Sequence, residues 1–187
     1  LQKNLEQYAA LCGPIKGQTE LIETFYQHNR RYHYAGYKSM PTREENYDAF
    51  VSRKDIQFIV LTRSDIASTT ASFYMAIRDG SWSRKGEPQP AHWHFDEKDD
   101  GQGIAGNLKY LATSHLLLER ITDPIHLTYE DLCSPGYCNA RLDDFFGRHI
   151  GLAAPRPPTS GADYVVNWDT FKAFVDRTYR ECLDAIS

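Results

Sequence analysis

Apolar residues recur every three or four positions in several stretches of the chain, which is the spacing of a helix with one buried face. This pattern predicts helices over residues 1–12, from about residue 19, and over 66–78, 107–121, 141–146 and 167–185. A further helix is expected over 42–50, because Thr42 and Glu45 match the sequence pattern of a capping box. Gly13-Pro14 and Pro124 interrupt the pattern and are expected to end the helices before them.

Two short apolar runs lack this spacing and are expected to be strands. Residues 57–62 read Gln-Phe-Ile-Val-Leu-Thr, a β-branched run typical of a strand buried on both faces of a parallel sheet. Residues 125–129 read Ile-His-Leu-Thr-Tyr and predict a second buried strand, and residues 34–38 are a weaker third candidate. Strands that alternate with helices indicate an α/β sandwich with a parallel sheet, which binds ligands where strand turns into helix.

Residues 81–103 have neither pattern. They are polar, contain Pro and Gly, and show no periodicity, so we expect a long loop that flanks the active site and is mobile without ligand. The loop also contains two aromatic residues, Trp82 and Trp93.

The composition is that of one folded domain. The chain has 187 residues, of which 41% are hydrophobic and 13% aromatic. A net charge of −4 gives no electrostatic reason to expect nucleic acid or an anionic membrane as partner. No transmembrane segment and no signal peptide are expected, and the four scattered cysteines favour reduced thiols in a cytoplasmic protein.

One segment carries a phosphate-binding pattern. Residues 58–73, FIVLTRSDIASTTASF, place Arg63 at a strand end and Ser72 nine residues on, in a helix. A dianionic phosphate favours a guanidinium, a hydroxyl and the free N–H groups of a helix start. The segment resembles the 3′-phosphate motif of sulfotransferases that use 3′-phosphoadenosine 5′-phosphosulfate (PAPS), and its spacing is similar to the bacterial, trehalose-type carbohydrate branch. In a plainer interpretation Arg63 pairs with Asp65 or another carboxylate, and Ser72 is an ordinary helix residue.

Two further segments are similar to that family. Residues 126–132, HLTYEDL, resemble its second strand–helix unit, where Glu130 and Asp131 would cap the next helix or hold the Arg63 region in place. Residues 155–179 resemble the loop that folds over the nucleotide, with Arg156 and the backbone of residues 159–162 as candidate ligands.

The resemblance covers roughly residues 34–180 and implies a fold and a reaction. The fold would be a three-layer sandwich around a parallel sheet, the P-loop NTPase-like sulfotransferase fold, as a single domain over 1–187. The reaction would move a sulfo group from PAPS, the co-substrate, to a hydroxyl of a carbohydrate or glycolipid, without need of a metal. The family's 5′-phosphosulfate loop is not found, so we expect an N-terminal strand and phosphate loop to be missing before Leu1.

The resemblance also suggests catalytic and acceptor residues. Glu20 is the candidate general base, with Glu23 one turn away as its alternative, and Lys38 would stabilise the bridging oxygen of PAPS. His92, Trp93 and His94 are candidates for binding the acceptor sugar.

Other functions remain open from the residues alone. The His92-x-His94 pair, with Asp96, Asp99 and Asp100 nearby, is the pattern of a metal-dependent hydrolase. A P-loop nucleotide kinase and a non-catalytic nucleotide-binding α/β module would share the architecture. The oligomeric state is also open, and a homodimer is one option.

Overall fold

The computed structural model describes residues 18–32, 34, 51, 53–78, 93–151 and 161–186, which form a mixed structure of helices and strands. Its elements are α2 (Gln18–His28), β1 (Ile59–Thr62), α4 (Ile66–Arg78), α5 (Glu97–Glu119), β2 (Ile125–Thr128), α6 (Tyr129–Leu132), α7 (Ala140–Phe146), the 3₁₀ helix η2 (Gly161–Asp163) and α8 (Trp168–Ile186). The chain divides into two compact units, residues 1–56 with 117–122, and residues 57–116 with 123–187.

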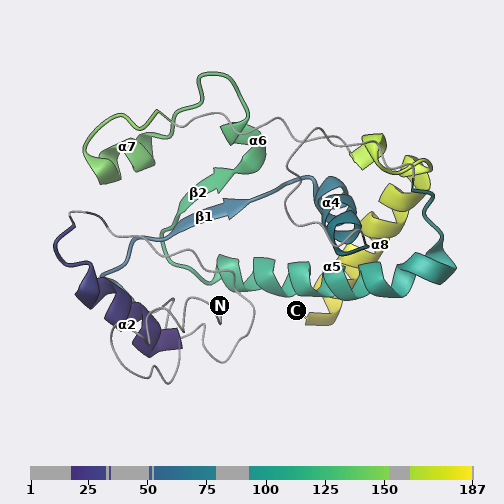
Figure 1. Cartoon of the computed structure of the whole chain (residues 1–187), viewed down its shortest axis with the longest axis horizontal. Helices are drawn as coiled ribbons and strands as arrows, with labels where there is room; N and C mark the ends of the chain where they lie inside the picture. The colour runs from purple at the N-terminus through teal and green to yellow at the C-terminus, as the bar shows by residue number, and fades with distance from the viewer. Residues whose placement is uncertain are drawn as a thin grey trace. The chain divides into compact units, whose positions relative to one another are not determined.

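The sheet belongs to the second unit. β1 and β2 run in the same direction, with Ile59 opposite Ile125 and Thr62 opposite Thr128 (Figure 1). The two predicted strands and their parallel pairing are therefore confirmed. One isolated parallel bridge joins Trp93 to Val165.

β1 is covered on one face only, so the expectation of a strand buried on both faces is wrong. Val60 is 3% exposed, whereas Ile59 is 45% and Leu61 is 54% exposed. Parallel register places Ile59 and Leu61 on the same face of the sheet as Ile125 and Leu127. The apolar cluster on that face contains Ile125, Leu127 and Leu142 of α7, and it does not extend over β1.

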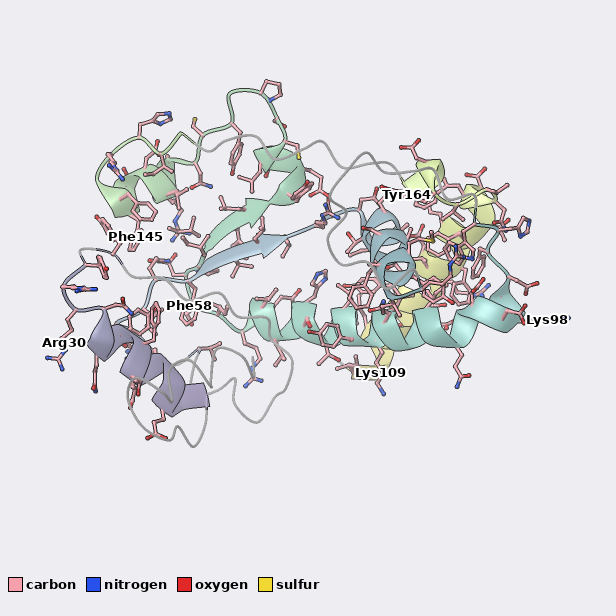
Figure 2. The ribbon with its side chains drawn as sticks, in the orientation of Figure 1. Arg30, Phe58, Lys98, Lys109, Phe145 and Tyr164 are labelled. Atoms are coloured by element: carbon pink, nitrogen blue, oxygen red, sulfur yellow. The ribbon has the colours of Figure 1, made fainter. Side chains whose placement is uncertain are left out.

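The helices α4, α5 and α8 enclose the main core of the second unit (Figure 1). Phe171 of α8 is fully buried, and its ring centroid lies 5.4 Å from that of Phe95, 5.5 Å from that of Trp93 and 5.6 Å from that of Trp168. Figure 2 shows the side chains gathered between these helices, while Lys98 and Lys109 point away from them. Aromatic rings from α4, from α8 and from the segment before α5 thus pack together in this core, to which α5 itself contributes Ile104 and Leu108.

α5 begins ten residues earlier than expected, so the loop predicted for 81–103 is wrong for residues 97–103. Asp96 caps the helix: its Oδ1 accepts the N–H of Lys98 at 2.8 Å, and its own N–H donates to Asp100 Oδ2 at 3.0 Å. Gly101 is buried, and a Cβ there would lie 3.4 Å from the ring of Phe174. Gly101 thus lies in the packed contact between α5 and α8, although in the sequence it resembles a loop signal. Residues 79–92 lie outside the described residues.

The other helix predictions in the described residues agree with the structure. α2, α4, α7 and α8 each match a predicted helix, with boundaries that differ by about one residue. Gly147, at φ 63°, closes α7 in the left-handed conformation that glycine favours. The helices expected over 1–12 and 42–50 fall outside the described residues, as does most of the strand expected over 34–38.

The first unit contains α2 and an exposed ion pair with two hydrogen bonds. Arg53 donates to both carboxylate oxygens of Asp55, at 2.8 and 2.6 Å, and lies 3.7 Å from Glu23. The hydrogen bond from Arg53 lowers the pKa of Asp55 to about 2.

Within the described residues, no helix combines the length and apolarity needed to cross a bilayer.

Candidate functional site

The ends of the two strands bring the most informative residues together. The last register pair is Thr62 with Thr128, so the next residues, Arg63 and Tyr129, meet at what we call the carboxyl edge of the sheet. The guanidinium carbon of Arg63 lies 4.0 Å from the centroid of the Tyr129 ring, a cation–π contact. Arg63 forms no ion pair with any residue that the structure describes. Its positive charge is therefore a candidate for binding an anion.

Glu130 holds the main chain beside Arg63. Its Oε1 and Oε2 each lie 3.2 Å from the backbone N of Ser64, and Oε1 lies 3.3 Å from the N of Asp65. The prediction that a carboxylate of this segment holds the Arg63 region is confirmed. Glu130 and Asp131 lie in α6 and not in a strand, because Thr128 caps this short helix by accepting the N–H of Asp131 at 3.0 Å.

The N-terminus of α4 is capped by the chain's own carboxylates. Asp65 Oδ1 accepts the N–H of Ser68 at 2.9 Å, and Ser68 Oγ donates to Asp65 Oδ2 at 2.7 Å. The N–H groups of Ser64 and Asp65 already donate to Glu130. The expectation that free N–H groups of this helix start bind a phosphate is therefore wrong for these three residues, and Arg63 remains the main candidate at the edge for binding an anion.

The segment after residue 160 reaches the same helix end. The backbone N–H of Gly161 donates to Ser68 Oγ at 3.1 Å, which joins η2 to the first turn of α4. Gly161 is within the backbone stretch 159–162 expected to help bind the nucleotide. Arg156 lies outside the described residues.

Ser72 lies farther from this edge than Ser68 does. It is the seventh residue of α4 and is exposed, about 9 Å along the helix axis from Ile66. Sequence reasoning selected Ser72 and missed both Ser68 and Tyr129. The available signals were the Asp65-x-x-Ser68 capping pattern and the matching positions of Arg63 and Tyr129 after two parallel strands.

The acceptor and catalytic candidates are not all described. Glu20 is exposed near the start of α2, in the first unit, and Glu23 of the same helix lies near Arg53. His94 is exposed. Lys38 and His92 lie outside the described residues.

Trp93 is a core residue, which corrects its assignment to the acceptor site. It is 5% exposed, and its ring packs against those of Tyr74, Phe95 and Phe171. Its Nε1–H lies 3.3 Å from Asp100 Oδ2. A ring enclosed in this way has no open face on which a sugar could stack.

The acidic residues after His94 make hydrogen bonds at the start of α5. Asp96 caps α5, and Asp100 accepts hydrogen bonds from the Tyr74 hydroxyl at 2.8 Å and from the N–H of Asp96. Burial and the hydrogen bond to Asp100 raise the pKa of Tyr74. No group of three potential metal ligands occurs among the described residues, which do not include His92.

The contacts of Glu130 predict a pH-dependent contribution to stability. Burial raises the pKa of Glu130, but hydrogen bonds from the backbone N–H groups of Glu130 itself, Ser64 and Asp65 outweigh it, so this pKa lies below its ordinary value. A carboxylate with a lowered folded-state pKa stabilises the fold above its ordinary pKa, and the contribution is lost as the pH falls through the lowered value. We expect Glu130→Gln to lower the free energy of unfolding at neutral pH. Urea titrations across the acid range should show this difference shrink, and a difference that does not change with pH would contradict the prediction.

The described site therefore consists of a strand-end cation backed by an aromatic ring, with a neighbouring carboxylate holding the main chain at the start of α4. These features come from two strand–helix units that are adjacent in space and distant in sequence. No protein-family model, no curated protein and no solved structure matches the chain.

Proposed function

We propose that this chain is the nucleotide-binding part of a PAPS-dependent sulfotransferase, in which Arg63 binds the 3′-phosphate at the carboxyl edge of the sheet. One observation carries the proposal. Parallel pairing of β1 with β2 brings Arg63 against Tyr129 and the adjacent Ser64 against Glu130, so the two segments that resemble the family meet at one place. Parallel α/β sheets bind their ligands at this edge.

The charge of Arg63 agrees with an anionic ligand, and the carboxylates of Asp65 and Glu130 at the same edge are engaged in hydrogen bonds to the main chain. Arg63 carries a positive charge without an ion pair to a described residue, and a guanidinium matches the geometry of a phosphate. The hydrogen bond from Gly161 to Ser68 supports a nucleotide-covering loop that ends near the same helix. In this proposal the sheet is part of a three-layer, P-loop NTPase-like sandwich.

The proposed reaction is an in-line transfer. The acceptor hydroxyl oxygen forms a bond to the sulfur of PAPS while the bond from sulfur to the phosphate oxygen breaks, which releases adenosine 3′,5′-bisphosphate. Glu20 takes the hydroxyl proton, Lys38 stabilises the charge on the bridging oxygen, and Ser72 and Arg156 assist Arg63. A carbohydrate or glycolipid is the proposed acceptor, with His92 and His94 beside it. Positioning and electrostatics would supply most of the rate, as in phosphoryl transfer.

A nucleotide comparison tests the proposal. Adenosine 3′,5′-bisphosphate should bind far more tightly than adenosine 5′-monophosphate, because only the former carries the phosphate assigned to Arg63. Arg63→Ala should remove most of this preference, at a cost of roughly 1.5–3 kcal/mol for a lost hydrogen bond to a charged group. Calorimetric titration of both nucleotides measures the effect.

Arg148→Ala is the matched control for this experiment. It removes the same charge from an exposed position just after α7. The preference for the bisphosphate should survive this change. Equal binding of the two nucleotides by the unaltered chain, or equal losses in the two variants, would overturn the assignment of Arg63.

A further inference from the structure

Two consecutive residues of α6 both reach the turn that carries Arg63. The Tyr129 ring lies under the Arg63 guanidinium at 4.0 Å, and the Glu130 carboxylate accepts the N–H groups of Ser64 and Asp65. Successive side chains of a strand would point to opposite faces of the sheet. The helical turn that begins after Thr128 lets both side chains contact the same turn.

We propose that Tyr129 and Glu130 form a clamp that fixes Arg63 in the orientation with which it binds the 3′-phosphate. The inference rests on the proposed function and adds two positioning residues to it. Glu130 fixes the main chain on the C-terminal side of Arg63, and Tyr129 fixes the guanidinium itself. Each acts through Arg63 and makes no contact with the ligand.

The physical basis is the loss of side-chain freedom on binding. A free arginine has many rotamers and loses them when it orders around a phosphate. A guanidinium already held over a ring loses fewer, so the clamp improves affinity without adding a contact to the ligand. The Tyr129 hydroxyl is not required for this effect, because the attraction arises from the aromatic face.

The first experiment compares Tyr129→Leu with Tyr129→Phe. Leucine removes the aromatic face and should weaken binding of adenosine 3′,5′-bisphosphate about 2- to 5-fold, the range for an exposed to partly buried cation–π contact. Phenylalanine keeps the face and should bind like the unaltered chain. Circular dichroism confirms that both variants are folded, and adenosine 5′-monophosphate, which lacks the 3′-phosphate, should bind all three proteins alike.

A double-mutant cycle tests whether Tyr129 acts through Arg63. In an Arg63→Ala background, Tyr129→Leu should cause no further loss of affinity, because there is no guanidinium left to orient. Glu130→Gln should weaken bisphosphate binding in the unaltered background and should likewise have no effect after Arg63→Ala. Additive losses would mean that these residues act independently of Arg63 and would overturn the clamp.

A measurement without ligand separates this inference from the proposed function. In NMR spectra the Arg63 Nε–H signal should be shifted upfield by the Tyr129 ring, should stay so in Tyr129→Phe, and should move to its ordinary position in Tyr129→Leu. An unshifted signal in the unaltered chain overturns the clamp, whatever the nucleotides do. The expected shifts together with equal binding of both nucleotides would support the contact and overturn the assigned ligand. A preference for the bisphosphate that Tyr129→Leu leaves intact would overturn the clamp and retain the proposed function.

Discussion

Phe171→Ala is expected to lower the free energy of unfolding by about 3–5 kcal/mol, the range for truncating a fully buried phenylalanine. The Phe171 ring is 0% exposed and is in contact with Phe95, Trp93 and Trp168. These partners come from α8 and from the segment just before α5, so no single side chain can move to fill the cavity. The loss should therefore fall toward the upper part of the range for such changes.

Urea unfolding followed by tryptophan fluorescence measures this effect, because Trp93 and Trp168 both contact the Phe171 ring. Phe171→Leu keeps part of the volume and should cost less, which gives a result even if the alanine variant does not fold. Phe145→Ala is the matched control: Phe145 lies on α7 and is 39% exposed (Figure 2). A loss there as large as that of Phe171→Ala would contradict the assignment of the core.

Gly161→Ala should destabilise the chain by about 3 kcal/mol, as an overpacked site does when a rigid ring blocks the added methyl group. A Cβ at Gly161 would overlap the six-membered ring of Trp168 and would lie 3.1 Å from Ser68 Oγ. Trp168 packs on Phe171, so its ring cannot turn away without disturbing the core. The same change should also strain the hydrogen bond from Gly161 to Ser68 at the N-terminus of α4.

Gly106→Ala provides a control with the same chemical change and the opposite expected sign. Gly106 lies in the middle of α5, is exposed, and has no atom within 4 Å of the position of an added Cβ. Alanine there should raise the stability by about 0.5–1 kcal/mol, because glycine is the weaker helix former. Thermal unfolding of the two variants beside the unaltered chain makes the comparison. Shifts of the melting temperature in the same direction would contradict the packing described for Gly161.

Local patterns in the sequence determined several elements of the fold. The apolar run before Arg63 and the run after Pro124 are strands, and they pair in parallel as expected. The helical spacing at 66–78 and 167–185 corresponds to α4 and α8. These features depend on residues that are neighbours in the chain, through propensity, capping and periodicity, so the sequence alone is enough to find them.

Only the tertiary structure decided the role of residues around the start of α5. Gly101 and the acidic residues near it have the composition of a loop, yet they form the first turns of a helix that Asp96 caps, and Gly101 is buried against Phe174. Trp93 has the sequence context of a loop residue, yet it packs in the core against rings from α4 and α8. The partners of Gly101 and Trp93 on α8 lie 73 and 78 positions away in the chain, and no local pattern reports them.

For the candidate site too, the sequence predicted some features and only the tertiary structure showed the others. The sequence alone indicated that Arg63 ends a strand beside a helix start, and that Glu130 has a structural role nearby. The contact of Arg63 with Tyr129, and the pairing of the α4 N–H groups with Glu130 and Asp65, required the folded chain. Ser64 and Glu130 are 66 residues apart, and they meet only because the parallel register of β1 and β2 ends both strands at one edge. Register between distant strands is a property of the assembled sheet, which is why Arg63 and Glu130 could be predicted singly, whereas Tyr129 and the arrangement of the site could not.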